Sequence, residues 1–177
     1  MVERVSDKDE AEGSIPSTPT NNMTVTSHIL TGAVLATTTN SFPVAFLLGF
    51  VSHFVLDAIP HLDPGTFFNI SGGEDKPWPA WVYIFAILEF IIIVVIFYIL
   101  FHNRTDFAII SVGALGGIFV DILDNNPLIF IHRWPIFKQL HWFHEKIHFN
   151  LPAQKWYWGL VTQLVIIGGT LWYLLKF

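Results

Sequence analysis

The sequence predicts an all-α, polytopic membrane helical bundle of about five spans with one interfacial amphipathic helix. Hydrophobic residues make up 53% of the 177-residue chain and charged residues only 13%, which is about half the charged fraction of a typical soluble domain. The chain also contains 17 Phe and 7 Trp, more large aromatic residues than a small soluble core can bury. These observations argue against a soluble domain, a disordered protein and a coiled coil.

The first 26 residues are expected to form a disordered polar tail, and residues 27–177 to form the membrane domain. Five acidic and two basic residues lie in the tail, which shows no apolar periodicity. Segments of this composition bury too little apolar surface to fold alone.

Five apolar segments follow the tail, and each is expected to form a membrane span. A bilayer core about 30 Å thick needs roughly 20 apolar helical residues, and segments 80–101 and 157–175 are about this long. Segment 107–123 contains three glycines, which let a neighbouring helix approach closely. Segment 42–59 ends before a proline, and segment 27–39 is short and rich in Thr.

Residues 125–155 do not form a further span. This segment mixes aromatic residues with His and Lys and is interrupted by Pro127, Pro135 and Pro152. Residues 136–149 within it are expected to form an amphipathic helix that lies at the membrane interface.

The distribution of basic residues predicts the orientation in the membrane. With five spans, the tail and segments 60–79 and 125–155 share one side, which has seven of the nine Lys and Arg residues. Positive residues concentrate on the cytoplasmic side of membrane proteins. We therefore expect the N-terminus and these segments to be cytoplasmic.

Charge and cysteine content exclude several functions. A net charge of −5 gives no support for nucleic-acid binding, which needs a basic face. Membrane lipid is the expected partner, because most of the chain is expected to lie in the membrane. The absence of Cys excludes thiolate zinc sites, iron–sulfur clusters and a cysteine nucleophile. A bound metal would therefore be held by His, Asp and Glu.

Such residues recur where the expected helices meet the cytoplasmic face. His53 and Asp57 are four residues apart, so they share one face of a helix. Charged groups beside membrane helices are costly unless they have a partner, and a divalent cation partners carboxylates and neutral imidazoles together. The predicted metal ligands are His28, His53, Asp57, His61, Asp121, Asp124, His141, His144 and His148.

The number and type of these ligands favour a hydrolytic metal site. Mixed nitrogen and oxygen donors suit Zn, Mn or Fe. More donors are present than one ion needs, which suits two ions about 4 Å apart with an open position for water. The expected cofactor is therefore one or two divalent ions, with zinc favoured over Mn or Fe.

The amphipathic segment contains the pattern His-Glu-x-x-His at residues 144–148. On a helix this pattern places two His on one metal with Glu145 as general base, so a membrane zinc protease using His144 and His148 stays an alternative. Three basic residues of the same segment are candidates to bind a phosphate: Arg133, Lys138 and Lys146.

Each feature also has a structural explanation. His53 and Asp57 could be a hydrogen-bonded pair that closes the bundle, and the His residues of segment 136–149 could form a solvated or pH-sensing face. Glu89, in the middle of the longest expected span, is either a functional carboxylate or a protonated group hydrogen-bonded within the bundle.

Two segments, TSHILTGAVLA and GFVSHFVLDAIPHLD, resemble a family of small prokaryotic inner-membrane proteins described as membrane-bound metal-dependent hydrolases. Those proteins open with a Thr/Ser-His-x-x-x-Gly helix, here Ser27, His28 and Gly32, and continue with a helix that ends in an acidic, His-rich block, here residues 53–63. The resemblance covers residues 24–65. It implies a location in the cell (inner) membrane and a metal-dependent hydrolytic activity, and it names no substrate.

Together these observations favour a membrane-bound metal-dependent hydrolase that acts on a phosphoester of a lipid or a membrane-adjacent substrate. A non-enzymatic metal-binding scaffold or regulator is an alternative outside the hydrolases. In that case protein ligands would fill every coordination position of the metal and leave none for water. The oligomeric state is not fixed by the sequence.

Overall fold

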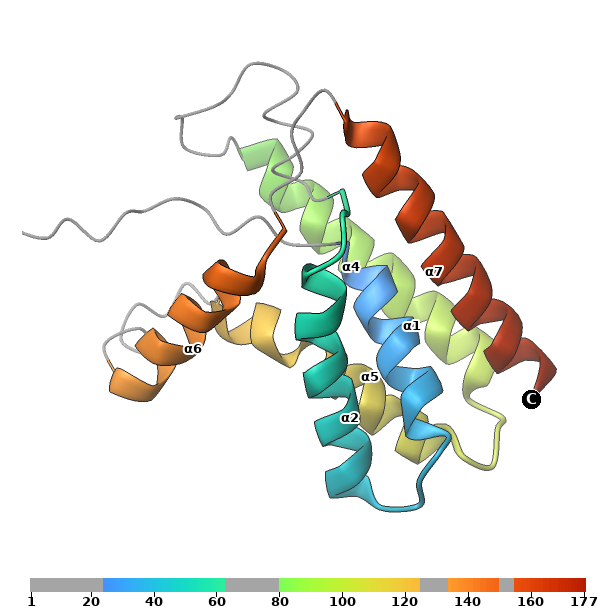
Figure 1. Cartoon of the computed structure of the whole chain (residues 1–177). Helices are drawn as coiled ribbons and strands as arrows, with labels where there is room; N and C mark the ends of the chain where they lie inside the picture. Colours follow the sequence, from blue (N-terminus) through green and yellow to red (C-terminus); the bar gives the residue numbers. More distant parts are fainter. Residues whose placement is uncertain (1–23, 63–79, 125–133, 150–154) are drawn as a thin grey trace, which may run out of the picture.

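A computed structural model of the chain describes residues 24–62, 80–124, 134–149 and 155–177 (Figure 1). Within these ranges all regular secondary structure is helical, which confirms the predicted all-α class. The helices are α1 (Val25–Ala36), α2 (Phe42–Asp57), α4 (Ala80–Phe101), α5 (Phe107–Asp124), α6 (Pro135–Ile147) and α7 (Trp156–Lys176).

Helix boundaries differ from the predicted ones by a few residues. Helix α1 begins two residues before the expected range, so Val25 and Thr26, which were assigned to the tail, are helical. Residues 1–23 of the expected tail lie outside the described ranges. Pro43 and Pro135 stand in the first turns of α2 and α6, where the N–H group that proline lacks would have no intrahelical partner.

Helices α1, α2 and α5 pack with their backbones in direct contact. A Cβ atom added to Gly32 or Gly49 would collide with the carbonyl oxygen of Gly113, and one added to Gly117 would collide with the carbonyl oxygen of His28. Glycine at these positions removes the side chain that would otherwise separate the helices. The three helices therefore form a tight inner group.

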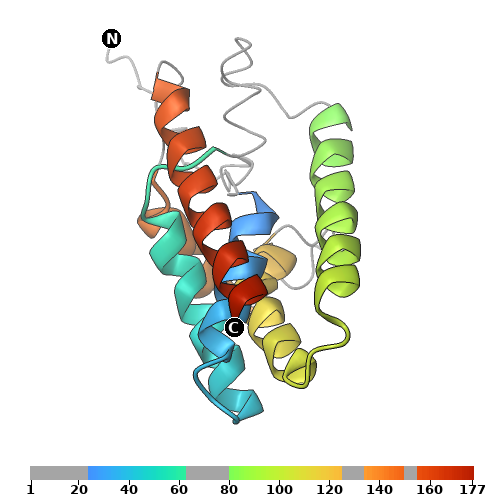
Figure 2. The ribbon, with the colours of Figure 1, turned by 90° about the vertical axis from the view of Figure 1, so that its right-hand side faces the viewer.

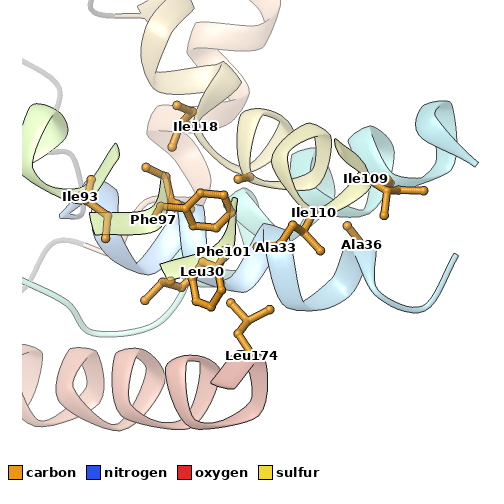
Figure 3. Packing of buried hydrophobic residues seen from close by; sticks show 13 residues of the cluster. Leu30, Ala33, Ala36, Ile93, Phe97, Phe101, Ile109, Ile110, Ile118 and Leu174 are labelled. Carbon is orange, nitrogen blue, oxygen red and sulfur yellow. The ribbon is translucent and has the colours of Figure 1, made fainter. Parts of the chain in front are cut away.

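Helices α4 and α7 lie outside this inner group (Figures 1 and 2). Phe97 and Phe101 of α4 are buried in an apolar cluster with Leu30 of α1 and Leu174 of α7. Figure 3 shows Leu30, Phe101 and Leu174 gathered in this cluster. Large apolar residues thus join the outer helices to the inner group.

A salt bridge fixes the turn between α4 and α5. The Arg104 guanidinium donates from Nε and Nη2 to the two carboxylate oxygens of Asp106, at 2.7 and 2.8 Å, and from Nη1 to the carbonyl oxygen of Leu174 at 2.6 Å. The hydrogen bonds from Arg104 lower the pKa of Asp106. This turn is therefore tied to the C-terminal end of α7.

Two helices are long and apolar enough to cross a membrane, as judged by length and composition. They are α4, with 22 residues, and α7, with 21 residues. The side chains of α4 are mostly exposed although they are nearly all apolar, an arrangement typical of a lipid-facing helix. The other three expected spans correspond to apolar helices that are shorter, and α1 has only 12 residues.

Candidate metal centre

Seven of the nine predicted ligands gather at one end of the inner helix group. Five of them lie on α1, α2, α5 and α6, which are far apart in the sequence, and the other two follow the C-terminal ends of α2 and α6. Three overlapping sets have ligand atoms within 4.8 Å of one another: His28, His53 and Asp121; His53, Asp57 and His144; and Asp57, His61 and His148.

Asp57 lies at the centre of the cluster. Its Oδ2 atom is 3.0 Å from His53 Nε2 and 2.9 Å from His144 Nε2, and its Oδ1 atom is 3.4 Å from His28 Nε2. The carboxylate is 1% exposed and the three imidazoles are no more exposed than that. A single buried carboxylate therefore faces three imidazoles.

The backbone of α5 orients the His53 ring. His53 Nδ1 is 2.8 Å from the carbonyl oxygen of Gly117, and because a carbonyl only accepts, Nδ1 must donate. In the neutral ring Nε2 then has a free lone pair, and this atom points at Asp57, His144 and, at 3.8 Å, Asp121 Oδ1. Metal-ligating His residues are held in the same way by a backbone carbonyl on the opposite nitrogen.

His61 and His148 form the second part of the cluster. The backbone carbonyl of Ile59 accepts a hydrogen bond from His61 Nδ1 at 2.7 Å, so Nε2 is the unprotonated nitrogen of this neutral ring. That atom lies 3.1 Å from His148 Nε2. Burial lowers the pKa of His61 and lowers that of His148 to about 3, so both rings are neutral near pH 7, the form that binds metals.

The spacings between the nitrogens match those of a metal coordination shell. Two nitrogens about 2.0–2.1 Å from a zinc ion in a tetrahedral site are about 3.4 Å apart. His53 Nε2 and His144 Nε2 are 3.3 Å apart, and His61 Nε2 and His148 Nε2 are 3.1 Å apart. Buried His and Asp groups here could therefore hold a metal ion.

Side chains of α7 hold the segment that contains His61. Thr162 donates a hydrogen bond to the carbonyl oxygen of Pro60, and Gln163 donates one to the carbonyl oxygen of Leu62. A Cβ atom on Gly159 would lie 2.6 Å from the carbonyl carbon of His61, so this glycine allows the close approach. These α7 residues were not predicted from the sequence, since Thr, Gln and Gly in an apolar span give no metal-binding pattern.

Helix α6 is anchored to α2 at the cluster. The Phe143 ring contacts Phe54 with ring centroids 5.2 Å apart, and the Phe149 backbone N–H donates to the carbonyl oxygen of Asp57 at 2.7 Å. His144 is 1% exposed, whereas Trp142, two residues earlier, is 61% exposed. The helix therefore turns its His ligand inward and Trp142 outward, as expected for an amphipathic helix.

The remaining predicted site residues lie outside the three ligand sets. His141 is partly buried, and Glu145, Lys138 and Lys146 are exposed on α6; Lys146 Nζ stacks over the Trp142 ring at 4.8 Å. Asp124 ends α5, but the position of its side chain is not described, and Arg133 lies outside the described ranges. His144 and His148 of the His-Glu-x-x-His pattern belong to different ligand sets.

Glu89 has a structural partner in α1. One of its carboxylate oxygens accepts hydrogen bonds from the Thr26 backbone N–H at 3.2 Å and from the Thr26 hydroxyl at 2.9 Å. A carboxylate is favourable at the N-terminus of a helix, where backbone N–H groups are unpaired. This arrangement ties α4 to the first turn of α1, two residues before His28.

Comparisons with protein families, with curated proteins and with solved structures find no match to this chain.

Proposed function

We propose that the protein is a membrane-bound metal-dependent hydrolase that cleaves a phosphoester of a lipid or of a substrate adjacent to the membrane. The observation that supports this proposal most strongly is the buried cluster around Asp57, whose ligand atoms come from four helices and have the spacing of a metal shell. Buried polar groups are costly unless they have partners, and a cation would pair with the carboxylate and the neutral imidazoles together.

The likeness of residues 24–65 to membrane-bound metal-dependent hydrolases supports the same proposal. His28, Gly32, His53 and Asp57 are residues of the segments that resemble that family, and they lie in or beside the cluster. Gly32 permits the close packing of α1 on α5 that brings His28 to the site.

We further propose that α1, α2, α4, α5 and α7 all cross the inner membrane and that the cluster faces the cytoplasm. The shorter helices α1, α2 and α5 would reach across as a tightly packed group, with polar helix ends at the face occupied by α6. Seven of nine basic residues on that side in the five-span topology support this orientation.

The chemistry of the site suits zinc, with Mn or Fe as alternatives, because all donors are imidazole nitrogens and carboxylate oxygens. A bound ion would supply a water ionised near neutral pH and would polarise the phosphoryl oxygen. Glu145 stays the proposed general base, and Lys138 and Lys146 the proposed phosphate contacts, since all three are exposed on the helix that provides His144.

Metal analysis and turnover test the proposal together. The full-length chain would be purified in detergent, loaded with Zn²⁺ or Mn²⁺, and assayed on bis(4-nitrophenyl) phosphate and on phospholipid vesicles. We expect turnover by the wild type and a loss of at least 100-fold for Asp57→Ala. His102→Ala is the matched control, because His102 is exposed and its Nδ1 atom is bonded only locally, to backbone carbonyls one turn back.

Other results would favour an alternative function or refute the proposal. Bound metal with no turnover of any phosphoester would favour the scaffold role, and cleavage of a peptide in place of a phosphoester would favour the protease. A metal-free wild type under metal-replete conditions would refute the hydrolase proposal.

A further inference from the structure

We infer that the cluster holds two cations bridged by the Asp57 carboxylate, and that the ion bound by His61 and His148 is the one that keeps a position open for water. This inference deepens the proposed function and rests on its metal site. It follows from the number of free ligand atoms that each residue offers.

The first two ligand sets describe one ion. Both sets contain His53, and His53 has a single free nitrogen, Nε2, because Nδ1 donates to the Gly117 carbonyl. One imidazole nitrogen binds one ion. The residues of these two sets are therefore alternative or joint ligands of a single cation: His28, His53, Asp57, Asp121 and His144.

The third ligand set describes a second ion. It shares only Asp57 with the other sets, and a carboxylate has two oxygens, each of which can bind a different cation. His61 and His148 contribute nitrogens that take no part in the first two sets. Asp57 is thus the one residue of the described cluster that belongs to ligand sets of both ions.

A buried ligand atom supports occupation of the first part by a cation. His28 Nε2, which lies 3.4 Å from Asp57 Oδ1, has no hydrogen-bond partner within the described residues. The free lone pair of His53 Nε2 faces an oxygen of Asp57 at 3.0 Å, and two such atoms repel each other unless a proton or a cation lies between them. Binding of a cation removes this conflict.

The two ions differ in the number of protein ligands. Up to five residues from α1, α2, α5 and α6 surround the first ion, which is enough to close a structural shell. The second ion has three ligands among the described residues, Asp57, His61 and His148, and three protein ligands with an open fourth position are typical of catalytic zinc. The second ion also links the segment after α2 to the end of α6.

The experiment measures metal stoichiometry on the detergent-purified full-length chain after equilibration with buffered Zn²⁺, followed by mass spectrometry. We expect two ions per chain in the wild type and in His102→Ala, and one in His61→Ala and in His148→Ala. Phosphoesterase activity should fall at least 100-fold in the one-ion variants, because the open position is lost with the second ion.

A second measurement does not depend on any variant folding. The wild type loaded with Mn²⁺ should give the electron paramagnetic resonance spectrum of an exchange-coupled ion pair, as expected for two ions that share a carboxylate. One ion per chain, or an uncoupled Mn²⁺ spectrum at full occupancy, would overturn the two-ion inference. If that single-ion protein still hydrolysed phosphoesters, the proposed function would stand, whereas a metal-free wild type would overturn both.

Discussion

Gly117 is the position where packing and the candidate metal centre depend on the same residue. Its carbonyl oxygen accepts the hydrogen bond that orients His53, and its missing side chain leaves room for the backbone of His28. Replacing it with alanine therefore perturbs the approach of α1 to α5 and the positions of two ligands.

The structure sets the size of this perturbation. A Cβ atom at residue 117 would lie 3.0 Å from the carbonyl carbon of His28 and closer still to its oxygen, whereas carbon atoms normally approach to about 3.5 Å. The two helices must then separate by about 0.5 Å or more. Metal–ligand distances tolerate only about 0.2 Å, so we expect Gly117→Ala to lower metal affinity about 10–100-fold, as changes around metal ligands do.

The effect on stability is smaller. Overpacking costs about 1–3 kcal/mol, and the better helix propensity of alanine offsets up to about 1 kcal/mol of this. Metal affinity would be measured by competition with a chelator, and stability by thermal unfolding in detergent. Gly168→Ala is the matched control, because nothing lies within 4 Å of a Cβ atom there; wild-type metal affinity in Gly117→Ala would refute the reasoning.

Three further predictions concern the turn, the apolar cluster and α6. Asp106→Asn should lower stability by about 0.5 kcal/mol at pH 7; because the pKa of Asp106 is lowered, the difference in melting temperature from the wild type should vanish as the pH falls below that pKa. Phe101→Ala should cost about 3–5 kcal/mol, since Phe101 is 1% exposed, while Leu100→Ala, at an exposed position, should cost about 0.5 kcal/mol. Chelation should speed amide hydrogen exchange in α6 and leave α4 unchanged, since α6 is held largely through His144 and the residues that follow it.

Each of these predictions has a contradicting result. A stability difference for Asp106→Asn that does not shrink as the pH is lowered into the acid range would show that the ion pair is not its cause. Equal losses of stability in Phe101→Ala and Leu100→Ala would place Phe101 outside the core. An amide exchange rate in α6 that does not change on chelation would show that metal does not anchor this helix.

The sequence was sufficient to predict the elements that depend on short patterns. The i, i+4 spacing of His53 and Asp57 placed them on one helical face, and the glycines of segment 107–123 indicated close packing. The amphipathic helix was also predicted, although its observed range, Pro135–Ile147, differs slightly from 136–149. These features are local, so composition and periodicity describe them.

Contacts between distant segments could not be predicted in the same way. The pairing of His61 with His148, and the support of the His61 segment by Gln163, join residues 87 and 101 positions apart. Nothing in a single sequence distinguishes His148, which lies in the cluster, from His141, which lies on the same segment outside the ligand sets. That distinction depends on the angle at which α6 meets α2.

The separation between Asp57 and His144 along the chain has a consequence for biosynthesis. His28, His53 and Asp57 belong to the first two helices, but the hydrogen-bonding partner His144 follows Asp57 by 87 residues. At roughly 5–20 residues per second, a ribosome needs about 4–17 s to make that stretch. During this interval the nascent chain has a carboxylate and two imidazoles without the partner from α6, so the cluster is completed only when most of the protein has been made.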